Sequence, residues 1–171
     1  MLEVDLRVID LWLTDLRHRK GRKADPLLRQ MREGHELYRV AREARAERIV
    51  EFTRSPSYRA AYLAAALRPG GILAVVVTED SPLPSPESVV PYKLAPRASV
   101  RLLGGLTEEG AESLMHTPAS SCDMVAVESG VPDDPWLNEG LRLLRHRGAL
   151  HIAGHPTNRI EFEPPGIEAH G

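Results

Sequence analysis

Apolar side chains recur at helical spacing through the first part of the chain, up to about Ala46. One stripe advances in steps of three and four residues and predicts a first helix, whose apolar face must be buried against the body or against another subunit. Asp25 then suits the N-cap of a second helix, with Pro26 at its first helical position. The first stripe consists of Leu2, Leu6, Ile9, Leu13 and Leu16, and a second stripe on its flank consists of Val4, Val8, Leu11 and Trp12.

From Arg48 onward, short apolar runs alternate with helical patterns. The run Ile72–Val77 is continuous and rich in branched side chains, which is typical of a parallel strand covered on both faces. Alternation of this kind predicts an α/β fold, with a mostly parallel open sheet and helices on both faces. We expect strands over 48–52, 72–77, 99–103, 123–127 and 149–153, and helices over 57–67, 107–115 (capped by Thr107) and 135–146.

The composition narrows the class of protein but not its function. A chain of 171 residues, 42% hydrophobic and 27% charged, is the size and make-up of one globular domain. A net charge of −2 gives no general reason to expect nucleic acid or an anionic membrane as partner. The single cysteine, Cys122, and an acidic N-terminus without a basic leader favour a cytoplasmic protein without an internal disulfide.

A basic cluster follows the first helix, from Arg17 to Lys23. Cations at a helix C-terminus complement its dipole, so a solvated helix end explains the cluster most simply. The charge is nevertheless uneven, since residues 1–50 hold twelve Lys and Arg against nine Asp and Glu, and the remainder holds ten against fifteen. A contact with nucleic acid is therefore kept as an alternative.

Five motifs follow one another along the chain: Arg48–Phe52, Ser57–Ala60, Ala65–Gly71, Asp123–Glu128 and Leu141–Arg145. In this order they resemble the class I S-adenosylmethionine-dependent O-methyltransferases of the catechol and caffeoyl-CoA type, which have Gly-Tyr-Ser-Ala in place of Ser57–Ala60. The resemblance runs from about Asp25 to His155 and implies a Rossmann-like methyltransferase fold. We expect a single domain over 1–171, with N-terminal helices over 1–47, a Rossmann-like core over 48–155 and an irregular tail over 156–171 that leaves the sheet shortened.

The resemblance implies S-adenosylmethionine as cofactor, yet the loop that would hold it has changed. Such proteins carry a glycine-rich turn after the first strand, where backbone approaches the ligand. Here the turn reads Thr53 to Ser57 and contains no glycine. The acid expected at the end of the second strand aligns with Val77, and Glu79 or Asp80 replaces it only after a slip in alignment. The candidate cofactor residues are Glu51, Thr53, Ser57, Tyr58 and Glu79.

The family's metal site and catalytic residues are also altered. Its first carboxylate corresponds to Glu128, but its Asp-Asn pair is replaced by Ala153-Gly154, so we expect no metal. Glu128 and His155 are the candidate catalytic residues, as an acid–base pair. The alternative is that Glu128 caps a loop and His155 is solvated. Arg54 either contacts a ligand carboxylate or phosphate, or pairs with Glu51 or with solvent.

Three functions remain open at this point. The first is a catalytically impaired methyltransferase-like protein that acts as a binding or partner subunit, as a homodimer or with another protein through its N-terminal helices. The second is an active S-adenosylmethionine-dependent O-methyltransferase with a remodelled loop. The third is a nucleic-acid-associated module. The first hypothesis predicts that S-adenosylmethionine binds weakly, with a Kd above about 100 µM.

Overall fold

The computed structural model describes residues 2–19, 25–91, 98–128, 133–155 and 160–161. The first two helices precede an alternation of strands and helices, as the sequence predicts. The helices are α1 (Leu2–Arg19), α2 (Asp25–Glu43), α3 (Tyr58–Ala66), α4 (Pro86–Val89), α5 (Glu108–His116) and α6 (Asp133–Leu143). The strands are β1 (Arg48–Thr53), β2 (Gly71–Val77), β3 (Ala98–Gly104), β4 (Cys122–Val127), β5 (Leu144–Ile152) and β6 (Ile160–Glu161).

The strands form one sheet in the order β3-β2-β1-β4-β5-β6. The first five are parallel, and β6 runs antiparallel to β5 at the edge. The central position of β1, with β2 beside it, confirms the predicted α/β architecture. The strand order changes direction at β1. The chain first adds β2 and β3 on one side of β1, and then crosses over to add β4 and β5 on the other side. In open sheets of this kind, ligands bind beyond the carboxyl ends of the strands at such a reversal.

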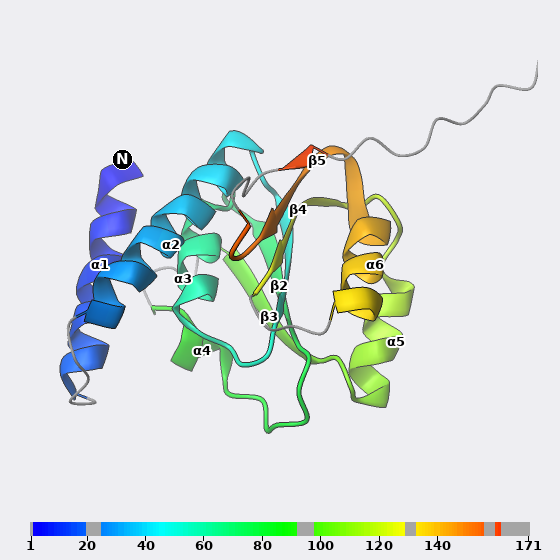
Figure 1. Cartoon of the computed structure of the whole chain (residues 1–171), viewed down its shortest axis with the longest axis horizontal. Helices are drawn as coiled ribbons and strands as arrows, with labels where there is room; N and C mark the ends of the chain where they lie inside the picture. Colours follow the sequence, from blue (N-terminus) through cyan, green and yellow to red (C-terminus); the bar gives the residue numbers. More distant parts are fainter. Residues whose placement is uncertain (1, 20–24, 92–97, 129–132, 156–159, 162–171) are drawn as a thin grey trace, which may run out of the picture.

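The molecule has three layers (Figure 1). Helices α1, α2 and α3 lie on one side of the sheet, and α5 and α6 on the other. Successive residues of each strand alternate between two cores, so Ile49 packs toward α3 while Val50 and Phe52 pack toward α6. A polar residue on the Ile49 face is therefore buried beneath α2 and α3.

Side chains cap two of the helices where the sequence predicts their starts. The hydroxyl of Thr107 accepts a hydrogen bond from the backbone of Gly110 at 3.1 Å, which confirms Thr107 as the cap of α5. Ser57 is the N-cap of α3, and its Oγ accepts from the backbone of Arg59 at 3.4 Å. Both caps satisfy amides that the first turn of a helix leaves without partners.

The boundary between α6 and β5 differs from the prediction. Residues 144–146 were predicted as the end of a helix, but α6 ends at Leu143 and β5 begins at Leu144. The pairing of β4 with β5 changes register between Cys122 and Met124, and Arg147 adopts a φ of 60° there. A helical spacing of leucines cannot reveal such a bulge, because its cause is the pairing of distant strands.

The C-terminal tail is described only in part. Within the tail predicted as irregular over 156–171, the structure has one short strand, β6 at Ile160–Glu161. The rest of the predicted tail, and Lys20–Lys23 of the basic cluster, lie outside the described residues.

The first helix is buried against its own domain. Ile9 and Leu13 are fully buried in the core, with Leu6 and Trp12 packed beside them. Asp10 ties the helix down further, since its carboxylate accepts from the hydroxyl of Tyr62 in α3 at 2.5 Å. Of the predicted second stripe, Leu11 remains 71% exposed. In the described part of the chain, no helix combines the length and apolar character needed to span a membrane.

Candidate functional site

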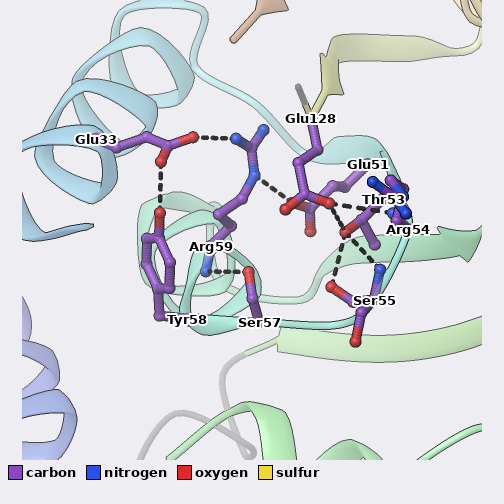
Figure 2. Close-up of polar contacts among 9 residues, drawn as sticks. All are labelled: Glu33, Glu51, Thr53, Arg54, Ser55, Ser57, Tyr58, Arg59 and Glu128. Carbon is purple, nitrogen blue, oxygen red and sulfur yellow. Dashed lines mark hydrogen bonds and ion pairs between the residues drawn. The ribbon is translucent and has the colours of Figure 1, made fainter. Parts of the chain in front are cut away.

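Five of the candidate residues gather at the carboxyl end of β1, where the loop from β1 to α3 meets the end of β4. Figure 2 shows Glu51, Thr53, Ser57, Tyr58 and Glu128 in this region, with Glu33 reaching in from α2. The loop from β1 to α3, the end of β4 and helix α2 meet here because β1 is the central strand, beside β4, and α3 packs against both the sheet and α2. Glu79 follows β2 at the same edge.

A buried ion pair lies at the centre of the site. Nε of Arg59 donates to Oε1 of Glu51 at 2.7 Å, and both side chains are 1% exposed. Nη1 of Arg59 also donates to Glu33, whose other carboxylate oxygen accepts from the hydroxyl of Tyr58. One guanidinium thus joins α3 to α2 and to β1.

The approach of α2 to α3 depends on Gly34. A Cβ atom at this position would lie 2.3 Å from the ring of Tyr62, so only glycine lets the two helices come this close. The adjacent residue, Glu33, thereby reaches Arg59. The ion pair of Glu33 with Arg59 therefore depends on the close contact between α2 and α3.

Burial controls the titration of this network. Burial raises the pKa of Glu51 despite the opposing charge of Arg59. For Arg59, burial lowers the pKa, but the charges of Glu51 and Glu33 outweigh it and leave the pKa above its usual value. Burial and the hydrogen bond to Glu33 raise the pKa of Tyr58 well above its usual range. One oxygen of Glu51 and one guanidinium nitrogen of Arg59 have no hydrogen-bond partner, although both are buried.

Glu128 is bound to the loop that follows β1. Its carboxylate accepts from the hydroxyl of Thr53 and from the backbone of Arg54, the latter at 3.1 Å. The carbonyl oxygen of Ser55 also lies 2.8 Å from the Thr53 hydroxyl, as an alternative acceptor for its single proton. Glu128 therefore caps the loop, and Thr53 is fully buried beneath it.

Arg54 has a different partner from the one predicted. The sequence suggested Glu51 or solvent, but Nε of Arg54 lies 2.5 Å from Oε1 of Glu79. The reason is that Glu51 points into the core toward Arg59, whereas Arg54 lies in the loop after β1, beside the carboxyl end of β2. The pair is about half exposed and joins the ends of β1 and β2.

The two histidines lie in different environments. His155 is exposed after β5, and no hydrogen bond joins it to Glu128 within the described ranges. His151 is 2% exposed, and neither ring nitrogen has a partner. It shares a row across the sheet with Glu51, because Ala126 pairs with both of them. Burial, followed by the charge of Arg59, lowers the pKa of His151 to about 4.

The site offers no cluster suited to a metal ion among the residues whose structure is described. Val77, the aligned position of the ribose-binding acid, is buried and pairs with Thr53 in the sheet. An uncharged, buried side chain there has no means of accepting hydrogen bonds from a ribose.

The chain matches no protein-family model and no curated protein sequence. Solved structures do match it. The O-methyltransferase TomG from Streptomyces achromogenes, in complex with SAM, is 20% identical with a TM-score of 0.57, over 86% of this chain and 70% of TomG. A methyltransferase from Geobacter sulfurreducens is 13% identical with a TM-score of 0.58, over 85% of this chain and 69% of that one. An O-methyltransferase from Bacillus cereus, in complex with SAH, is 14% identical with a TM-score of 0.54, over 87% and 65%.

The chain has the fold of class I S-adenosylmethionine-dependent O-methyltransferases. At these identities the likeness shows the fold alone, and function depends on the site. Within this methyltransferase fold, the three candidate carboxylates are already engaged. Glu51 binds Arg59, Glu79 binds Arg54, and Glu128 binds the loop itself. The residues present therefore do not fit S-adenosylmethionine in the manner usual for the family.

Sequence reasoning missed Glu33 and Arg59. A signal for Arg59 was present, because it is the only charged residue in an otherwise apolar helix, Tyr58–Ala66, where the family pattern has serine. A buried arginine requires a carboxylate partner, and Glu51 in an apolar strand was an available one. No comparable signal marked Glu33, which lies in a helix rich in charged residues.

Proposed function

We propose that this methyltransferase-fold protein is catalytically impaired and acts as a binding or partner subunit. The observation that carries the proposal is the engagement of Glu51 by Arg59 inside the core. A carboxylate held in this way is not available to a ligand. Releasing it would leave a buried guanidinium without its counter-charge, which costs several kcal/mol.

The loop above this ion pair supports the same proposal. The hydroxyl of Thr53 bonds within the loop, and the hydroxyl of Ser57 caps α3. Arg54, which follows β1, forms an ion pair with Glu79. A glycine-rich turn would leave this space to backbone and ligand. Here the turn carries side chains, and those of Thr53, Arg54 and Ser57 form hydrogen bonds with other groups of the protein.

Titration calorimetry with S-adenosylmethionine and S-adenosylhomocysteine tests the proposal. We expect a Kd above about 100 µM for both, which corresponds to about 5.5 kcal/mol of binding. Arg54→Ala serves as a matched variant, because it removes the exposed ion pair with Glu79 at the carboxyl ends of β1 and β2 and leaves the buried core unchanged. Low-micromolar binding by the wild type would contradict the proposal.

An active O-methyltransferase with a remodelled loop is the second candidate. The observation that favours it is that Glu128 lines an open pocket at the same edge. In this case Glu128 accepts a proton from the acceptor hydroxyl, with His155 brought close by rearrangement after β5. Transfer of a labelled methyl group from S-adenosylmethionine to a panel of catechols, abolished by Glu128→Gln, would establish it.

A further inference from the structure

A pocket of about 440 Å³ opens between α1, α2, α4 and the loop after β1. Its volume is within the range of small-molecule sites in proteins. Its lining includes apolar side chains, among them Trp12 and Leu16 of α1 and Val89 of α4. It also includes the polar side chains of Arg17, Gln30 and Glu128.

Arg17 is the unusual feature of this pocket. Its side chain is only 9% exposed, and no carboxylate lies within ion-pair distance of it among the described residues. A guanidinium that lines a pocket and has no counter-charge within ion-pair distance favours the binding of an anion there. Arg59, by contrast, is paired with two carboxylates.

The neighbouring groups form no ion pair with Arg17 among the described residues. Glu128 lines the same pocket, but its carboxylate is bound to the hydroxyl of Thr53 and to the backbone of Arg54. Gln30 carries a buried side-chain oxygen that also has no partner. The described residues therefore leave the donors of Arg17 unused, whereas the free oxygen of Gln30 is an acceptor and does not bind a carboxylate.

We propose that this pocket binds a small organic carboxylate that carries an apolar group. The planar guanidinium of Arg17 matches a carboxylate with two parallel hydrogen bonds, and Trp12 and Leu16 cover the apolar part. This inference rests on the proposed function as a binding protein and names the class of its ligand.

Tryptophan fluorescence gives a direct readout, because the chain has two tryptophans and one of them lines the pocket. In a Trp136→Phe background the signal comes from Trp12 alone. Phenylacetate is the probe, and phenylacetamide is its neutral counterpart of the same shape. We expect phenylacetate to change the fluorescence with saturation, and phenylacetamide to bind at least tenfold more weakly.

Arg17→Met tests the assigned residue, since it keeps the length of the side chain and removes its charge. We expect this variant to bind phenylacetate at least tenfold more weakly, or about 1.4 kcal/mol. Arg42→Met, at an exposed position of α2, is the matched control and should bind as the wild type does. Thermal unfolding of Arg17→Met should remain cooperative, and with the apolar replacement the Tm should hold or rise.

Three results would overturn the proposal. They are saturation by inorganic phosphate at lower concentration than phenylacetate, equal affinity for phenylacetamide, and undiminished phenylacetate binding by Arg17→Met. Calorimetry with S-adenosylmethionine separates this outcome from that of the proposed function. Tight S-adenosylmethionine binding contradicts catalytic impairment, whereas loss of phenylacetate binding contradicts only the carboxylate pocket.

Discussion

Glu51 and Arg59 form an ion pair inside the core, with Nε and Oε1 2.7 Å apart and both side chains 1% exposed. The pair lies beneath the loop where a methyltransferase fold normally presents glycines to its cofactor. Glu33 completes the charge balance from α2. The site is therefore held together by interactions among its own side chains.

Replacement of Arg59 tests how much the network stabilises the fold. Arg59→Met leaves Glu51 buried without its partner, so we expect the free energy of unfolding to fall by about 3–5 kcal/mol. Urea unfolding followed by circular dichroism measures this loss. The double variant Arg59→Met/Glu51→Leu should recover most of it, because it removes both charges from the core.

Arg68→Met is the matched control for that experiment. Arg68 pairs with Glu47 at 2.9 Å, but both side chains are more than half exposed. Exposed pairs of this kind contribute less than about 1 kcal/mol. If Arg59→Met and Arg68→Met lower the free energy of unfolding equally, the buried network stabilises the fold no more than an exposed ion pair does.

His151 predicts an acid sensitivity of the fold. Burial lowers its pKa to about 4 in the folded protein, whereas an unfolded histidine has a pKa of about 6.5. Between these two pH values the unfolded chain therefore binds a proton at His151 and the folded chain does not. Stability therefore falls as the pH drops from about 6.5 toward 4, and this contribution levels off below that. The loss between pH 8 and pH 5 amounts to about 2 kcal/mol.

Unfolding of wild type and His151→Leu at both pH values measures this contribution. We expect the difference in stability between the two proteins to shift by about 2 kcal/mol in favour of the variant at pH 5. The comparison cancels the titration of groups that both proteins share. A shift that does not differ between the two would exclude His151 as the source.

Self-association through the N-terminal helices is the prediction for assembly. Ile9 and Leu13, which were predicted to lie on the face that meets a partner, are buried in their own core. Leu11 of α1 and Leu28 of α2 are 71% and 63% exposed, and covering them in an interface would remove apolar surface from water. Light scattering at micromolar concentration should show a dimer that Leu11→Glu/Leu28→Glu converts to monomer. If the wild type is a monomer and no partner protein is recovered with it from cell extract, the hypothesis of a partner subunit loses its support.

Local patterns in the sequence were sufficient for the order and type of most elements. The alternation of apolar strands and helices predicted the parallel sheet, and Thr107 marked its helix start, because spacing and capping depend on neighbours in the chain. The missing glycines after β1 were also visible from the sequence. They indicated that the site had changed, but not what had replaced it.

Tertiary structure decided which charges meet. Arg54 pairs with Glu79 and not with Glu51, and Arg59 joins Glu51 to Glu33 across elements that are distant in the chain. These partners depend on strand order, on the face to which each side chain points and on the approach of α2 at Gly34. Leu144 entered a strand for a similar reason, since its pairing with Cys122 outweighs its helical spacing. Sequence fixes such preferences residue by residue, whereas ion pairs and strand pairing form only between groups that the completed fold brings together.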